Sequence, residues 1–181
     1  MNDLLSRVIT SHRGLERWNK ITLSESDVSV TGSTWSRKGW PDALKNVHVS
    51  AHPQDQWISY RPFTGGKKRS RCTPAYTVIE TLDGEIVKES HNPRSAFAGH
   101  TAETKWDDLH LAYFSGYAMW NYLTTPFLFA MEGFEVEELP RCRDGGQERR
   151  RMKVVFPRSI ATHCREQVFY VDDQHLIARL D

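Results

Sequence analysis

The residue pair best placed for acid–base chemistry is Asp107 and His110, three positions apart at the start of a predicted helix. Side chains three residues apart share one helical face, so the carboxylate can orient the imidazole as a general base. The same pair can also cap the helix without any catalytic role. An enzyme would need a second polar group facing His110, and the sequence identifies none. We therefore place catalysis by this pair below a non-enzymatic function.

The other histidines do not have the spacing of a metal centre. His91 and His100 complete neither an HExxH nor a Glu-x-x-His pattern with His110. His48 and His52 share a face of a predicted strand, but four residues of strand separate them by roughly 13 Å. Because a metal needs ligands that converge on one point, the sequence predicts no metal and no cofactor.

Aromatic residues gather on one predicted helix, from Trp106 to about Leu123. This helix is apolar on most of its sides, which is typical of a buried helix. Its aromatic stripe either lines an apolar pocket or packs as core between the helix and a sheet. Arg94 and His100 precede the helix, where they would meet the carboxylate or phosphate head group of a ligand. The predicted ligand-binding residues are Trp106, Tyr113, Tyr117, Trp120, Arg94 and His100.

The elements that would position these residues follow from the periodicity of apolar residues. An amphipathic helix is expected from Asp3 to Trp18, with Gly14 near its end. A period of two, interrupted by turn signals such as Asp83-Gly84, predicts antiparallel strands over residues 21–90 and 134–180. The sequence thus predicts an α+β fold, in which a strongly curved antiparallel meander sheet, or half-barrel, wraps around the buried central helix, with a helix at the N-terminus.

Shorter segments carry expectations of their own. Thr104 is the expected N-cap of the central helix, and Thr125-Pro126 is expected to open a short helix that ends at Gly133. Residues 65–69 are expected to form an exposed basic loop. We expect one domain over residues 1–181. Residues 176–180 still alternate like a strand, so either they form an edge strand or the chain stops before its domain is complete.

The charge balance argues against nucleic acid as a partner. The chain has 181 residues with 24 basic and 23 acidic side chains, a net charge of +1. A binder held to nucleic acid by bulk charge would be far more basic. The alternating Arg149, Arg151 and Lys153 are expected to pair with Glu135, Glu137 and Glu138 across the hairpin, and contact with an anion, a head group or RNA is the alternative. The oligomeric state is not predictable from the sequence.

The cysteines and the absence of a leader suggest a cytoplasmic protein. No apolar stretch is long enough for a signal peptide core or a membrane span. Three cysteines, Cys72, Cys142 and Cys164, cannot all pair within one chain, and we expect three buried thiols in a reducing compartment. Cys164 follows His163 directly in a predicted strand, where the two side chains would point to opposite faces, which disfavours a Cys–His nucleophile.

Several segments carry a resemblance to known proteins. The chain resembles a family of bacterial proteins with no assigned function in Asn92-Pro93-Arg94, residues 97–100, 106–110 and 113–117, Trp120-Asn121-Tyr122, and the later segments Phe156-Pro157, Thr162-His163 and 167–170. Members of that family tend to continue beyond the point where this chain stops. In outline, strands around a central helix are also similar to the bacterial lipoprotein-carrier fold, a half-barrel that holds acyl chains. The missing signal peptide is a departure from those carriers.

Three functions therefore stay open from the sequence. The leading one is a domain that binds an apolar or amphipathic small molecule, such as a lipid, between the sheet and the aromatic helix. The second is an enzyme that uses Asp107 and His110 in the same pocket. The third is a structural or interaction domain without a ligand.

Overall fold

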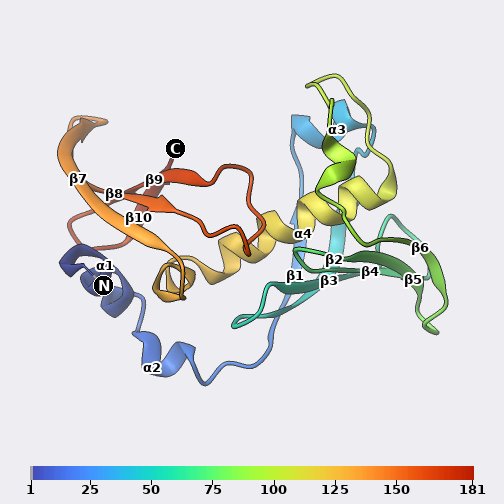
Figure 1. Ribbon diagram of the computed structural model, residues 1–181, viewed down its shortest axis with the longest axis horizontal. Coiled ribbons are helices and arrows are strands. Elements are labelled where there is room, and N and C mark those ends of the chain that lie inside the picture. The colour runs from blue at the N-terminus through green and yellow to red at the C-terminus, as the bar shows by residue number, and fades with distance from the viewer. Residues whose placement is uncertain (1) are drawn as a thin grey trace. The chain divides into compact units, whose positions relative to one another are not determined.

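The computed structural model describes residues 2–181 and combines α-helices with two antiparallel sheets (Figure 1). Contacts between residues divide the chain into two compact units. Unit 1 combines the N-terminal residues up to Ile21 with Asn121–Asp181, and unit 2 is Thr22–Trp120. Each unit has its own sheet and its own core. The single domain expected over residues 1–181 stays a prediction.

Unit 2 contains a six-stranded antiparallel meander in which every strand pairs with its neighbour in sequence. The strands are β1 (Ser24–Val30), β2 (Leu44–His52), β3 (Trp57–Arg61), β4 (Lys68–Cys72), β5 (Thr77–Thr81) and β6 (Ile86–Ser90). The short helix α3 (Ser33–Lys38) follows β1, and the 3-10 turn η1 (Ser95–Phe97) follows β6. The alternation of β2 is confirmed, because Val47, Val49 and Ala51 are buried on one face. The hairpin around Asp83-Gly84 is confirmed as well.

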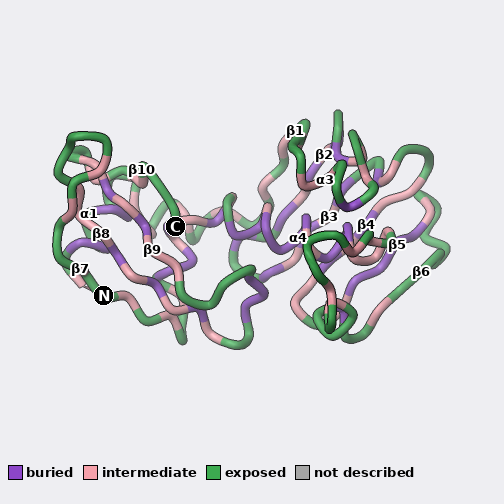
Figure 2. Tube along the Cα trace, turned by 90° about the horizontal axis from the view of Figure 1, so that it is seen from above, coloured by how far each residue is buried: buried purple, intermediate pink, exposed green. Residues whose placement is uncertain are grey.

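The long helix α4 (Asp108–Thr124) packs against this meander and is one of the most continuously buried segments (Figure 2). Gly116 allows the close approach. A Cβ atom added there would lie 2.8 Å from Cβ of Cys72 and 3.2 Å from Cγ2 of Ile58. A larger residue would therefore push the helix away from β3 and β4.

Unit 1 places two helices and a 3-10 turn beside a four-stranded antiparallel sheet. Its elements are α1 (Asp3–Ser11), α2 (Leu15–Trp18), η2 (Phe127–Ala130), β7 (Glu135–Asp144), β8 (Gln147–Val155), β9 (Glu166–Val171) and β10 (Ile177–Leu180), with sheet order β10-β9-β8-β7. The apolar face of α1 is buried. In the same core the Phe129 ring lies 4.7 Å from that of Phe169, measured between centroids.

The single sheet expected around the central helix is wrong, because the strands form two separate sheets. The reason lies in α4. The helix is apolar on most sides, but residues up to Trp120 belong to unit 2, whereas those from Asn121 onward belong to unit 1. Within unit 2, Ile58 and Cys72 of the sheet lie next to α4 at Gly116, and Trp35 of α3 lies 6.0 Å from the Phe114 ring, so the helix does not require one enclosing sheet.

Three expected boundaries are also wrong. The helix expected from Asp3 to Trp18 is two helices, interrupted at positions 12–14. The central helix begins at Asp108 and is capped by Asp107, not by Thr104. The exposed basic loop expected over residues 65–69 is confirmed for residues 65–67, but Lys68 and Arg69 are half-buried and begin strand β4. The sequence does not predict β4 because its inward-facing residues, Ser70 and Cys72, do not give the alternation of large apolar residues that is typical of a strand.

The cysteines are all free, but only Cys72 is buried as expected. Cys142 is half-buried and Cys164 is exposed, so the expectation of three buried thiols is wrong for these two. Cys164 lies in the loop before β9, outside the strand in which it was predicted. None of the described helices has the length and apolar character that crossing a membrane requires.

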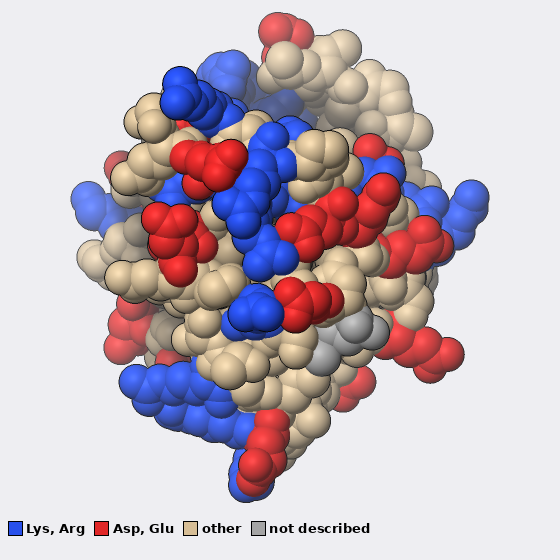
Figure 3. Space-filling model, turned by 90° about the vertical axis from the view of Figure 1, so that its left-hand side faces the viewer, with Lys and Arg blue, Asp and Glu red and all other residues tan. Residues whose placement is uncertain are grey.

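Of the charge pairs predicted between β7 and β8, only that of Lys153 is confirmed, because Arg149 donates to Gln147 and Arg151 donates to the carbonyl oxygen of Pro140. Arg150 binds Glu138 at 2.8 Å, and Lys153 lies 3.5 Å from Glu137. On the face that carries α1 and β7, basic and acidic side chains lie next to each other without separating into large patches of one sign (Figure 3). Arg150 and Lys153 thus have neighbouring charges of opposite sign.

Candidate ligand-binding site

Three residues of the predicted aromatic site are core residues of unit 2. Trp120 is fully buried, and its Nε1 donates to the carbonyl oxygen of His52 at 2.8 Å. Tyr113 and Tyr117 are also buried. Burial raises the pKa of Tyr113, and the hydroxyl group points to the carbonyl oxygen of Pro74 at 3.4 Å. These geometries match the packing interpretation of the aromatic stripe.

Trp106 and His100 do come together, around Phe97. The Phe97 ring lies 5.6 Å from Trp106 and 5.4 Å from His100, measured between centroids. The ammonium of Lys38 lies over the Trp106 ring at 5.2 Å and donates to three backbone carbonyls of residues 101–104. Arg94, the last of the six predicted residues, is exposed. The ring contacts of Phe97 and the hydrogen bonds of Lys38 therefore stabilise the segment that precedes α4.

Asp107 and His110 form the predicted pair, but in the geometry of a helix cap. Asp107 accepts from the backbone N–H of His110 at 2.8 Å, and its Oδ1 lies 2.6 Å from Nδ1 of His110. Nε2 of His110 lies 3.1 Å from the carbonyl oxygen of Ala96, so both ring nitrogens are engaged within the fold. Burial alone would raise the pKa of Asp107, but the hydrogen bonds and the charge of His110 outweigh it and lower that pKa. A general base needs an accessible lone pair, which this arrangement does not offer.

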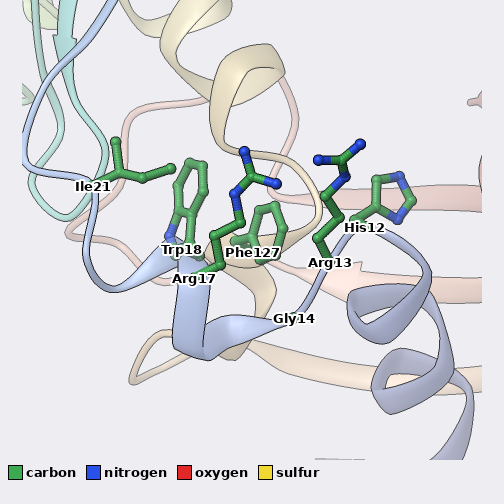
Figure 4. A pocket seen from close by; sticks show the side chains of 7 residues that line it. All are labelled: His12, Arg13, Gly14, Arg17, Trp18, Ile21 and Phe127. Carbon is green, nitrogen blue, oxygen red and sulfur yellow. The ribbon is translucent and has the colours of Figure 1, made fainter.

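A pocket of about 220 Å³ in unit 1 brings together aromatic and cationic side chains (Figure 4). It lies where the end of α1, the whole of α2 and the start of η2 meet. Its lining residues are His12, Arg13, Gly14, Arg17, Trp18, Ile21 and Phe127. None of them was among the residues that the sequence predicted to bind a ligand.

The turn between α1 and α2 makes this pocket. Gly14 has φ of 79°, a left-handed conformation that glycine adopts at little cost, and its N–H donates to the carbonyl of Ile9 at 2.9 Å. Arg13 has almost the same φ, 78°. For a residue with a Cβ atom this conformation costs roughly 1–2 kcal/mol. The chain therefore places an arginine at a position where glycine would be easier to accommodate.

The apolar wall of the pocket is a pair of stacked rings. Trp18 and Phe127 lie with centroids 4.4 Å apart and planes inclined by 8°. His12 meets the edge of Phe127 at 6.4 Å. Because Trp18 comes from α2 and Phe127 from η2, this contact joins two segments that are far apart in the sequence. The half-buried rings offer a ligand an apolar, planar surface.

Two uncompensated positive charges border the same pocket. Within the described residues, no carboxylate lies within ion-pair distance of the guanidinium of Arg13 or Arg17, whereas Glu16 on α2 is bound to Lys20 at 2.8 Å. Figure 4 shows the Arg17 side chain beside the Trp18 and Phe127 rings and the guanidinium group of Arg13 near His12. Nδ1 of His12 lies 2.8 Å from the carbonyl oxygen of Val8, and this bond fixes Nδ1 as the donor. Nε2 of His12 is then the ring nitrogen that a ligand can meet.

A second pocket of about 320 Å³ lies in the same unit, between the start of α1, η2 and β7. It is lined by Asn2, Leu5, Leu15, Phe129, Ala130, Met131, Phe134 and Val136. Among the residues that the structure describes, no charged side chain borders it. Its described lining therefore suits an apolar group better than an anion.

No protein-family model matches the chain, and neither does any curated protein or solved structure. The sequence signal for the pocket was present but weak. Arg13-Gly14 lies inside an otherwise helical pattern, and glycine there marks the chain reversal that places Arg13 and Trp18 beside one pocket. Phe127 has no sequence signal that connects it with them.

Proposed function

We propose that the protein binds a small amphipathic molecule in the pocket bordered by Arg13, Arg17 and the stacked rings of Trp18 and Phe127. The observation that carries the proposal is the coincidence of two unpaired guanidinium groups with a half-buried aromatic surface. Guanidinium groups bind carboxylates and phosphates through paired hydrogen bonds, and the rings provide apolar contact. This keeps the predicted ligand class but moves the site away from α4.

The size of the pocket limits what enters it. A water molecule occupies about 30 Å³ of liquid, so 220 Å³ corresponds to roughly seven waters. Pockets that hold drug-sized ligands usually measure about 300–1,000 Å³. The pocket therefore accommodates a small ring with an anionic group, or the head of a longer lipid-like molecule whose tail stays outside. The lipid ligand, the half-barrel shape, the bacterial resemblance and the cytoplasmic location stay predictions.

The catalytic alternative has weaker support. Its base, His110, has Nδ1 beside Asp107 and Nε2 beside the carbonyl of Ala96, as expected for a cap. A structural domain without a ligand remains the competing hypothesis. The two differ in a measurable way, because only the binding hypothesis requires saturable binding of an amphipathic anion.

The test is isothermal titration of 3-phenylpropionate, with neutral 3-phenylpropanol as the matched probe. We expect saturable binding of the anion and much weaker binding of the alcohol. Arg17→Gln should reduce the affinity for the anion by roughly 10-fold or more, since a hydrogen bond to a charged group contributes about 1.5–3 kcal/mol.

Arg158→Gln provides the control, because Arg158 is an exposed arginine of unit 1 that does not line the pocket. It should leave the affinity unchanged. Binding of neither probe, or equal losses in the two variants, would contradict the proposal and leave the structural domain as the better description.

A further inference from the structure

We propose that the head group taken by this pocket is a phosphate monoester carried on a planar ring, an inference that rests on the proposed binding function. The pocket presents two cations, Arg13 and Arg17, with no acidic residue within ion-pair distance in the described chain. A carboxylate or a sulfate ester has one negative charge, which leaves one of the two cations uncompensated. A phosphate monoester has a charge close to −2 at neutral pH and compensates both.

The number of donors points to the same group. Each guanidinium offers several N–H donors in a planar fork. A phosphate monoester has three terminal oxygens for these groups, whereas a carboxylate has two. Arginine forks bind phosphate with two parallel hydrogen bonds, so the two arginines together occupy the terminal oxygens more completely.

The stacked rings account for the rest of the ligand. Trp18 and Phe127 lie parallel at 4.4 Å, too close for another ring to enter between them. A ligand ring therefore stacks on the outer surface of the pair or meets its edge. Ile21 lines the pocket as well and supplies a further apolar contact. The volume of about 220 Å³ accommodates a single substituted ring.

The conformation of Arg13 supports a functional origin for its charge. At φ of 78° a glycine would be accommodated more easily, and residues in such conformations cluster at binding sites. This makes Arg13→Gly an informative variant. It removes a cation from the pocket and places glycine, which adopts a positive φ at little cost, at the same position. We therefore expect the fold to be retained, so that loss of binding reports the loss of the cation.

The experiment compares phenyl phosphate with phenyl sulfate, which has the same shape and number of terminal oxygens but one negative charge. At pH 7.5 we expect phenyl phosphate to bind roughly 10-fold more tightly to the wild-type protein, the equivalent of about 1.4 kcal/mol. In Arg13→Gly and Arg17→Gln this ratio should fall towards one, while Arg158→Gln should retain it. The melting temperature of Arg13→Gly should equal or exceed that of the wild type.

A parallel experiment with lipid vesicles tests whether the phosphate monoester comes from a membrane. Vesicles of phosphatidylcholine with phosphatidic acid present a phosphate monoester, and vesicles with phosphatidylglycerol present only a diester. Binding of phenyl phosphate supports the inference. Binding of the phosphatidic acid vesicles alone overturns it, because their phosphate monoester is carried on glycerol and not on a planar ring. Equal binding of phenyl phosphate and phenyl sulfate overturns the inference but leaves the proposed function intact. Failure of every anion, 3-phenylpropionate included, overturns both.

Discussion

Arg13 and Arg17 reach the same pocket by different routes. Arg17 lies on α2, where an ordinary helical backbone presents its side chain. Arg13 depends on the reversal at residues 12–14, which turns the chain out of α1 before α2 begins. In an uninterrupted helix the two arginines, four residues apart, would already share one face. The break adds the residues of the turn itself, because His12, Arg13 and Gly14 line the pocket together with Arg17 and Trp18.

His48 provides a test at the same scale, in unit 2. Hydrogen bonds from its ring to Asp27 at 2.9 Å and Glu25 at 3.3 Å raise the pKa of His48 above the usual value. We expect Asp27→Asn to lower the pKa of His48 in a proton NMR titration. Asp55→Asn changes a carboxylate in the β2–β3 turn and should leave it unaltered. An unchanged pKa in Asp27→Asn would show that the Asp27 contact is not formed in solution.

The sign of the effect on stability follows from the direction of the shift. A raised pKa means that the folded state binds the proton more strongly than the unfolded chain, in which histidine titrates near 6.5. The pair of His48 and Asp27 therefore stabilises the fold fully below that value. Its contribution disappears as the pH rises through the pKa of the folded state.

Between elements, Glu80 joins β4 to β5 by a buried charge. Its side chain is 3% exposed and accepts from Arg71 at 2.8 Å and from Arg69, which lies directly opposite on β4. Burial alone would raise the pKa of Glu80, but the hydrogen bonds from the two arginines outweigh it, so that pKa is lowered. Strand β4, which the sequence did not predict, is therefore held to β5 by Arg69 and Arg71. The basic character of this segment had favoured the prediction of a loop.

We expect Glu80→Gln to reduce the free energy of unfolding by roughly 1.5–3 kcal/mol at pH 7, because it removes two charge-assisted hydrogen bonds. The lowered pKa of Glu80 gives stability that is present above its unfolded pKa, near 4.5, and lost as the pH falls through its folded pKa. Urea denaturation at pH 7 and pH 3 should therefore show a smaller difference between variant and wild type in acid. Glu85→Gln, an exposed change in the same hairpin, is the control. A Glu80→Gln variant as stable as the wild type at pH 7 would contradict the buried ion pair.

At the scale of the whole molecule, the sequence predicts local pairing well and long-range organisation poorly. Alternation and turn residues predicted the hairpins β2–β3, β5–β6 and β7–β8, because these signals lie within a few residues of one another. Strand β4 was missed because small polar residues face inward, and α3 because the strand pattern was extended across it. The division into two sheets depends on which strands meet in space, which periodicity does not encode.

The difference between local and long-range signals also explains why the sequence did not predict the site. Four of the six predicted binding residues were chosen for aromatic character on one helix, and that character also describes a buried core. Trp120 and Tyr113 pack as core. The pocket instead combines the region of α1 and α2 with η2, which follows more than 100 positions later in the sequence. Only the fold brings Phe127 beside Trp18.

The two units of the chain lead to a prediction about its unfolding. Each unit has its own sheet and core, with Trp120 fully buried in unit 2 and Phe129 buried in unit 1. Each alanine substitution, Trp120→Ala or Phe129→Ala, should cost about 3–5 kcal/mol in the unit that contains it. We expect scanning calorimetry to resolve two transitions, with each variant lowering a different one by more than about 10 °C. Amide hydrogen exchange at a temperature between the two transitions would assign them, because the unit that has already unfolded loses its protection. A single transition lowered equally by both variants would instead establish one cooperative domain over residues 1–181, because loss of either core would then destabilise the whole chain.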